Sequence, residues 1–424
     1  MAGELSAGLP RAIVVDASDG GLVVARSLRA RGVPVTVLAQ PHYAWTTRAR
    51  GVDGRVMGSL EEPAPWLEAL AGLAEQGDGV LIPVSDRACE FLVRERERIP
   101  ARLRSFEGPS SAHLRLMDKG SLYALATEAG LRVPASTQVA RRADLAGVAA
   151  TTPFPCLVKP VLSHRFRGIM GDRRVRVVRD AEELDREAGP ALDAGLELLV
   201  TEQVPGPETN LEGAVTVRRE DGSFALAYAR NKLRQHPPYF GAGSVMGCID
   251  SPGVLAYART LLDHVGFVGL SSLEAKRHAE TDELVLMEIN VRVPQNFGLS
   301  VACGTDGPWR LYAALAGLPL GPQPEPRPGR KTIIVTLELH AAPAYVRAGD
   351  LSIPGLLGSY RGVRNASGLS VRDPAPVAAF LRPIVTRGLR RAGSAGLSVL
   401  RRRAAPPPEG TGEATATMPT RVGP

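Results

Sequence analysis

The chain has 424 residues, of which 44% are hydrophobic and 22% are charged. This composition excludes a wholly disordered chain and a collagen, and the length predicts roughly two to four domains. The formal net charge is +7, but arginine is spread along the whole chain and lysine occurs only at positions 119, 159, 232, 276 and 331. Scattered basic residues are typical of solvated faces, so we expect no nucleic-acid partner.

The cysteines and the apolar segments indicate a protein of a reducing compartment. Cys89, Cys156, Cys248 and Cys303 are far apart in the sequence, which argues against a disulfide framework and a structural zinc site. The first ten residues lack a basic region, and no apolar run reaches eighteen residues. We therefore expect neither a secretory signal nor a transmembrane helix, and a cytoplasmic location.

Strands and helices alternate over residues 1–110, which predicts a parallel α/β sheet. The expected strands are residues 13–15, 33–38 and 80–84, and the expected helices are residues 22–30 and 87–98. The loop at residues 16–21 lacks the G-x-G-x-x-G spacing that brings backbone close to a pyrophosphate. A nicotinamide or flavin site is therefore disfavoured.

The rest of the chain is predicted to be a mixture of α/β and α+β structure. Helices are expected at 117–130, 181–194 and 252–265, strands at 154–160, 175–178, 196–203 and 332–340, and a hairpin at 211–232. A Pro-rich linker covers residues 321–329, and composition predicts disorder after about residue 404. The expected divisions are an N-terminal α/β domain at 1–112, lobes at 113–205 and 206–320, a linker with a small C-terminal region at 321–403, and a tail at 404–424.

The segment 269–292 has the pattern of a hairpin with a polar face and an apolar face. Pairing His278 with Leu284 places Glu274 opposite Glu288, with Asn290 two residues further along the same strand. The apolar face then carries Leu273, Ala275, Val285, Met287 and Ile289. Two facing carboxylates repel unless a cation lies between them, and three oxygen donors suit magnesium. A solvated face without a ligand is the alternative.

The scarcity of lysine makes two positions informative. Lys159 ends the apolar run at 156–158 beside a glycine-containing loop, and Lys119 begins a helix just before the same segment. Ammonium groups at such places can bind phosphate, although exposed surface lysines are the alternative for each.

Together these motifs resemble the ATP-grasp superfamily of carboxylate–amine ligases over about residues 110–320. The resemblance rests on the pair DK at 118–119 before AGLRVP at 129–134, and on PCLVKP at 155–160, TEQVPG at 201–206 and MEINVR at 287–292. It implies a two-lobed ATP-grasp core that follows the N-terminal parallel α/β domain. Residues 232–247 and the sequence GFVG at 266–269 are most similar to the branch with D-aspartate ligase-like enzymes.

The resemblance also implies a role for individual residues, with ATP and magnesium, or manganese in its place, as the bound species. The residues implied to contact ATP through its phosphates, base or ribose are Lys119, Lys159, Glu202, Gln203, Val204 and Glu208. The implied metal ligands are Glu274, Glu288 and Asn290, and Arg292, Arg234 and Lys232 would face the transferred phosphoryl group and the acyl phosphate. The implied substrates are a small carboxylate and an amine, each amino-acid-like or peptide-like.

Some segments depart from the family pattern or leave alternatives open. The loop at 163–171 has only two glycines, so Arg165 or Arg167 is expected to supply charge to the phosphates, and Val291 stands where proline is usual. Residues 232–247 are predicted to form a polar and aromatic loop that determines specificity. The basic segment 382–403 favours a solvated tail, with contact to an anionic membrane surface as the alternative. Phosphorylation without amide formation and a non-catalytic ATP-binding module are the rival functions.

Overall fold

The computed structural model describes residues 8–108, 110–161, 175–383 and 386. It divides into two compact units between Val377 and Ala378, and the elements below belong to the first. The expected phosphate loop at 163–171, nearly all of the basic segment 382–403 and the tail at 404–424 lie outside the described residues. Among the helices that are described, none is both long and apolar enough to cross a membrane.

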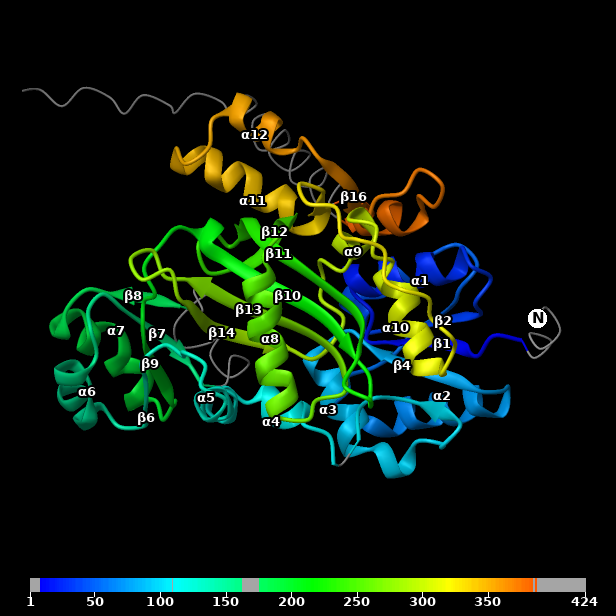
Figure 1. Ribbon diagram of the computed structural model, residues 1–424, viewed down its shortest axis with the longest axis horizontal. Coiled ribbons are helices and arrows are strands. Elements are labelled where there is room, and N and C mark those ends of the chain that lie inside the picture. The colour runs from blue at the N-terminus through cyan, green and yellow to red at the C-terminus, as the bar shows by residue number, and fades with distance from the viewer. Residues whose placement is uncertain (1–7, 109, 162–174, 384–385, 387–424) are drawn as a thin grey trace, which may run out of the picture. The chain divides into compact units, whose positions relative to one another are not determined.

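The N-terminal part, which is blue in Figure 1, contains a parallel sheet of five strands in the order β3-β2-β1-β4-β5. The strands are β1 (Arg11–Val15), β2 (Val35–Ala39), β3 (Asp53–Val56), β4 (Gly79–Pro83) and β5 (Leu103–Arg104). The helices that accompany them are α1 (Asp19–Arg29), α2 (Pro63–Glu75) and α3 (Asp86–Arg94). The near-continuous apolar runs of β1, β2 and β4 are buried, as expected for strands of a parallel sheet. The predicted α/β leader is confirmed.

A second, smaller sheet has the strand order β6-β9-β7-β8, and its pairs are antiparallel. Its strands are β6 (Ser136–Val139), β7 (Cys156–Pro160), β8 (Arg176–Val178) and β9 (Leu198–Glu202). The helices α6 (Leu145–Thr151) and α7 (Ala181–Asp193) pack with this sheet around a separate apolar core. This sheet places Lys159 on β7 and Glu202 at the end of β9.

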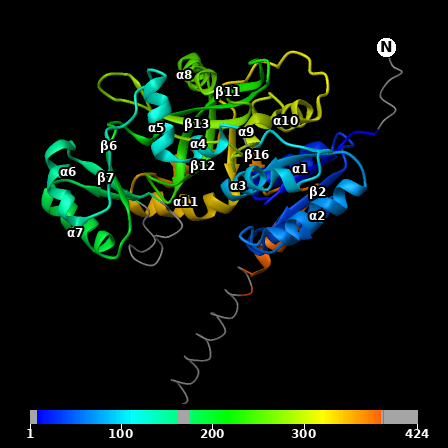
Figure 2. The same ribbon diagram turned by 90° about the horizontal axis from the view of Figure 1, so that it is seen from below.

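The third sheet has seven strands in the order β14-β13-β10-β11-β12-β15-β16. These are β10 (Leu211–Arg218), β11 (Phe224–His236), β12 (Ala242–Ile249), β13 (Gly269–Arg277), β14 (Leu284–Asn290), β15 (Lys331–Ile334) and β16 (Val363–Ser367). Helix α8 (Pro252–His264) and helix α11 (Val335–Ala348) lie on opposite sides of this sheet (Figure 2). The side with α8 is apolar, and its core includes Leu273 and Ile289. The other side carries the polar face of the β13–β14 hairpin.

The helix expected at residues 117–130 precedes the smaller sheet, and a further short helix lies just before it. Helix α4 (His113–Met117) ends at Asp118, and helix α5 (Lys119–Glu128) begins there. The Asp118 carboxylate accepts a hydrogen bond of 2.8 Å from the backbone N–H of Ser121, which is an N-cap interaction. The predicted helix is therefore confirmed as α5, and the cap at Asp118 explains why it begins at Lys119.

The region after the Pro-rich linker contributes two strands to the large sheet. β15 pairs with β12, and β16 extends the sheet beyond β15. The expected strand at 332–340 is wrong beyond residue 334, because α11 begins at Val335. Glu338, Ala341, Ala342 and Tyr345 are buried at helical spacing, so this face of α11 packs inward although the sequence before it alternates.

The remaining helices and turns connect these parts. They are α9 (Gly298–Ala302), α10 (Gly307–Ala316) and α12 (Ile353–Ser359), and the 3₁₀ helices Pro41–Arg48, Arg96–Arg98, Arg142–Asp144 and Glu208–Asn210.

Candidate active site

Glu274 and Glu288 lie directly opposite each other on the paired strands β13 and β14, as the sequence predicts. Asn290 pairs with Ser272 on the same strands, so it lies on the same face as the two carboxylates. The three predicted metal ligands therefore share one side of the hairpin.

The register nearer the turn differs from the prediction by one residue. Arg277, rather than His278, pairs with Leu284, because a bulge lies at the step from Glu274 to Ala275. Leu286 consequently pairs with Ala275 and is fully buried in the apolar core, while Met287 is half-buried. Val285 is fully buried as expected, but it and Met287 do not lie on the predicted face, because an extra residue in one strand exchanges the two faces.

Two cations lie beside Glu274. The Lys232 ammonium is 2.8 Å from Glu274 Oε1, and Arg230 Nη1 is 3.7 Å from Glu274 Oε2. All three side chains are at most 12% exposed. Ion pairs that are this well shielded from water are stronger than surface pairs, so they fix the carboxylate in place.

A chain of hydrogen bonds runs from Glu288 to Asp86, the first residue of helix α3 in the N-terminal part. The Asn290 amide donates to Glu288 Oε1 at 2.7 Å, Arg292 Nη2 donates to Asn290 Oδ1 at 2.9 Å, and Arg292 Nε donates to Asp86 Oδ1 at 3.0 Å. Burial opposes the charge on Glu288, but Lys232, Lys119, the Asn290 amide and Arg292 outweigh burial and hold its pKa below the usual range. Glu288 is therefore a carboxylate at neutral pH.

The two lysines of the smaller lobe act on each other. Burial, together with the nearby charge of Lys119, lowers the pKa of the Lys159 ammonium to about 7, and Glu288 offsets part of this effect. Two like charges held close together in a shielded place favour an anionic ligand. Lys119, Lys159 and Glu288 thus interact electrostatically with one another.

This pKa gives a prediction about proton uptake. Above pH 7 the folded protein holds Lys159 largely as the neutral amine, and a bound phosphate favours the ammonium form. Binding of a non-hydrolysable ATP analogue at about pH 8 should therefore take up roughly one proton, and the uptake should fall towards zero at about pH 6. Calorimetry in buffers of different ionisation enthalpy measures the uptake. Lys159→Met should abolish it and Lys331→Met should not; uptake that is unchanged in Lys159→Met contradicts the assignment.

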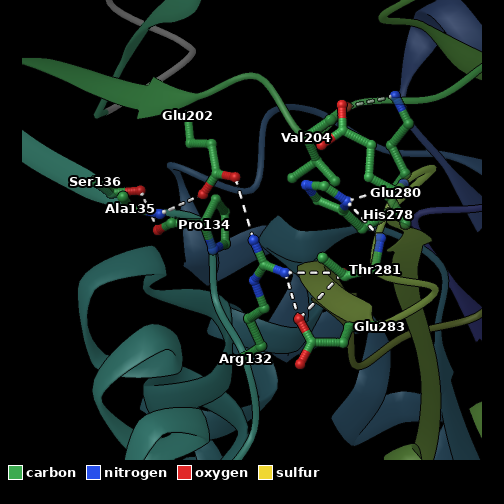
Figure 3. Close-up of polar contacts among 11 residues, drawn as sticks. Arg132, Pro134, Ala135, Ser136, Glu202, Val204, His278, Glu280, Thr281 and Glu283 are labelled. Atoms are coloured by element: carbon green, nitrogen blue, oxygen red, sulfur yellow. Dashed lines mark hydrogen bonds and ion pairs between the residues drawn. The ribbon is translucent and has the colours of Figure 1, made fainter. Parts of the chain in front are cut away.

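The predicted base-binding segment is tied to the turn of the β13–β14 hairpin (Figure 3). Glu202 accepts a hydrogen bond from the backbone N–H of Ala135 at 3.1 Å, and its other oxygen is 3.4 Å from Arg132 Nη2. Arg132 also contacts Glu283 at 2.5 Å in the turn. The Glu202 carboxylate is thus held by protein groups, and Arg132 links both lobes.

Gln203 and Glu208 each have a side-chain oxygen that accepts no hydrogen bond from the described residues. Gln203 Oε1 and Glu208 Oε1 are buried, and neither has a hydrogen-bond partner among the residues that the structure describes. The other oxygen of Glu208 accepts from the Tyr345 hydroxyl at 2.6 Å. Lys276 Nζ donates to the Val204 carbonyl at 2.8 Å in the same place. Buried acceptors are usually satisfied, so these two oxygens fit a ligand that donates hydrogen bonds.

Arg234 has a partner within the protein. Its guanidinium forms a two-pronged ion pair with Glu338 of α11, at 2.9 Å from Nε to Oε1 and 2.5 Å from Nη2 to Oε1, and it donates to Ser359 Oγ at 3.1 Å. The structure therefore does not show Arg234 at the facing carboxylates, where Lys232 lies.

The segment 232–247 is mostly strand. β11 continues to His236 and β12 begins at Ala242, so the expectation of a long loop was wrong and the connection is residues 237–241. Tyr239 and Phe240 in this connection are 50% and 43% exposed. The strands continue because much of the segment is buried in the sheet, including Arg234 and Gln235 on β11 and the run 243–248 on β12.

Several residues that contact the site were not predicted from the sequence to belong to it. Arg230, Lys276, Arg132, Asp86 and Tyr345 each contact a predicted site residue or its backbone. A signal was available for Lys276, since it is one of five lysines and follows Glu274 on the same face of the strand. The contacts of the other four depend on tertiary structure.

Comparisons with known proteins bear on the fold. No protein-family model matches the sequence, and no curated protein matches it. Among solved structures, N5-carboxyaminoimidazole ribonucleotide synthetase in its ADP complex aligns with a TM-score of 0.60 at 19% identity, over 76% of this chain and 81% of that one. The same enzyme from Thermus thermophilus aligns with a TM-score of 0.56 at 20% identity, over the same shares.

A biotin carboxylase from Campylobacter jejuni, solved with an ATP-type nucleotide, aligns with a TM-score of 0.57 at 13% identity, over 76% of this chain and 74% of that one. At these identities the likeness concerns the fold. With its N-terminal parallel sheet, its small antiparallel sheet and its large, mostly antiparallel sheet, this chain therefore has the fold of these solved structures.

Proposed function

We propose that this protein is an ATP-dependent ligase that activates a carboxylate as an acyl phosphate and joins it to an amine, with release of ADP and phosphate. The observation that carries the proposal is the group of cations, Lys119, Lys159, Lys232 and Arg292, around the facing carboxylates Glu274 and Glu288. The cations outnumber the carboxylates, so the site is complementary to an anion such as a triphosphate.

The described residues fit a nucleotide at the edge between the two lobes. Lys119 and Lys159 bind its phosphates, and Glu202, Gln203 and Val204 border the base. The unpartnered oxygens of Gln203 and Glu208 match the amino group of adenine and the hydroxyl groups of ribose, which are donors. Structures with this fold have been solved with ADP and ATP, which supports the same ligand here.

The residues also fit a hard divalent cation. Glu274, Glu288 and Asn290 offer oxygen donors, and Glu288 is ionised. The described part of the chain contains no group of three or more His, Cys, Asp or Glu side chains that could hold a metal ion. The proposed site differs from such a group because its third ligand is the amide of Asn290. Two carboxylates and an amide suit magnesium, with manganese as the alternative, since magnesium keeps waters and takes phosphate oxygens. When bound, the ion would neutralise charge on the phosphates.

The side chains around the site can perform the proposed reaction without a protein nucleophile. A carboxylate becomes an electrophile when its oxygen takes the terminal phosphoryl group of ATP, and an amine then displaces phosphate to form the amide. Lys232 and Arg292 stabilise the charge of the transferred group, while the rigid strands position the reactants. We also assign Arg234, two residues after Lys232 on β11, to the groups that stabilise the transferred phosphoryl group.

We further propose that both substrates are amino-acid-like or peptide-like and that the protein belongs with the D-aspartate ligase-like branch. The similarity of residues 232–247 and 266–269 to that branch supports this proposal. The exposed Tyr239 and Phe240 flank the strand that carries Lys232, so they are placed to contact a substrate.

A screen of ADP release over pairs of amino acids and dipeptides, with mass spectrometry of the products, tests the function. We expect ADP formation that requires both a carboxylate and an amine, and a product lighter than the summed substrates by one water. ADP formation that is independent of every amine would favour phosphorylation alone. Magnesium-dependent ATP binding without turnover on any pair would favour a binding module.

A further inference from the structure

Four residues form one continuous row across four strands of the large sheet. Arg230 on β11 pairs with Gly213 on β10, Gly213 pairs with Glu274 on β13, and Glu274 pairs with Glu288 on β14. Directly paired residues point to the same side of a sheet. Arg230 therefore belongs to the face that carries both carboxylates.

Gly213 leaves the space through which the Arg230 side chain reaches β13. A Cβ atom at position 213 would lie 2.6 Å from the Leu273 carbonyl oxygen and 3.1 Å from Arg230 Cζ. The guanidinium thus passes over the glycine, and its Nη2 donates to Ser272 Oγ at 3.0 Å while Nη1 lies 3.7 Å from Glu274 Oε2. Any other residue at 213 would obstruct this path.

The hydrogen bonding of Arg230 differs from that of a buried arginine with a structural role. Arg310 is also buried, and its two Nη atoms donate to the carbonyls of Ala225, Gly321 and Pro322. Arg230 is 3% exposed, yet its Nε and Nη1 have no hydrogen-bond partner within the described part of the chain. Leaving such groups unsatisfied is costly, so packing alone does not account for Arg230 at this place.

We propose that Arg230 is a positioning residue for Glu274, and that position 213 is glycine so that the Arg230 guanidinium can cross to this carboxylate. The inference rests on the proposed function, because it concerns how Glu274 takes the divalent cation of the nucleotide. Arg230 attracts Oε2 while Lys232 holds Oε1, so the carboxylate is kept in one orientation beside Glu288. A preset orientation removes the cost of ordering the ligand when the cation binds.

The test uses the full chain with Arg230→Met, Arg230→Lys and Gly213→Ala. Arg310→Met is the control for loss of a buried arginine, and Gly72→Ala is the control for glycine, since a Cβ atom there has no neighbour within 4 Å. Calorimetry measures the Mg²⁺ concentration that half-saturates binding of a non-hydrolysable ATP analogue. Thermal melting without ligand measures stability, and kcat and KM are determined on the substrate pair from the screen.

We expect Arg230→Met to raise the half-saturating Mg²⁺ concentration by about tenfold, Arg230→Lys to restore part of it, and Gly213→Ala to shift it in the same direction. The loss should appear in kcat more than in the KM of the carboxylate and amine. Arg310→Met should lower the melting temperature and leave the Mg²⁺ dependence unchanged. If Arg230→Met does not fold, Arg230→Lys and Gly213→Ala carry the test.

Two outcomes overturn the inference, and they are distinguishable. Nucleotide binding by the natural protein with an unchanged Mg²⁺ dependence in the folded Arg230 and Gly213 variants overturns the positioning role alone. Absence of Mg²⁺-dependent nucleotide binding in the natural protein overturns the proposed function and this inference with it.

Discussion

Glu288→Gln is expected to lower turnover by at least about a thousandfold, which corresponds to about 4 kcal/mol of transition-state stabilisation. The substitution keeps the shape of the side chain and removes its negative charge. Glu288 is ionised because Lys119, Lys232 and Arg292 outweigh its burial, and this charge is what a divalent cation requires. Steady-state assays of ADP release measure the effect.

The fold should survive this substitution. Glutamine can still accept the hydrogen bond from the Asn290 amide, and it relieves the burial of a charge, so we expect the melting temperature to change little. Glu280→Gln in the turn of the same hairpin is the matched control, because that side chain is exposed. Near-normal turnover in folded Glu288→Gln would show that the metal assignment is wrong.

Arg234→Met is expected to lower the free energy of unfolding by about 3–5 kcal/mol. The Arg234 and Glu338 side chains are 4% and 8% exposed, so the substitution leaves a buried carboxylate without its partner. The Tyr360 hydroxyl, which donates to Glu338 at 2.8 Å, does not replace a full positive charge. Chemical denaturation of both proteins measures the difference.

The double variant Arg234→Met with Glu338→Leu separates stability from chemistry. Removal of both charges leaves no unpaired group, so most of the lost stability should return. A stable double variant that remains inactive supports the proposed position of Arg234 at the phosphoryl group. A double variant with full activity shows instead that Arg234 only joins α11 to the sheet.

The facing carboxylates were predictable because alternation in a strand is strictly local. Glu274, Glu288 and Asn290 fall on one face in any register that buries Leu273 and Ile289, and the structure has that register. The N-terminal sheet was predictable for a similar reason, since the apolar runs of β1, β2 and β4 are typical of buried parallel strands.

The errors arise where tertiary packing decides between local patterns. The residues after Ile334 alternate like a strand, yet they form α11 because Ala341, Ala342 and Tyr345 bury a helical face. The bulge at Met287 has no signal in the sequence, since an extra residue in one strand is compatible with the same composition. The roles of Arg230 and Arg132 depend on partners in distant segments, so no local pattern indicates them.

The pairing of β12 with β15 changes where the chain can be shortened. Residues 321–329 look like a natural place to cut, because proline and glycine dominate them. Removing everything beyond this linker would remove β15, which pairs with Val245, Met246 and Gly247 of β12. The edge of β12 would then be unpaired, and unpaired strand edges promote aggregation. It would also take away Tyr345 and Glu338, the partners of Glu208 and Arg234. A trimmed protein intended for crystallisation should therefore retain at least residues 8–377.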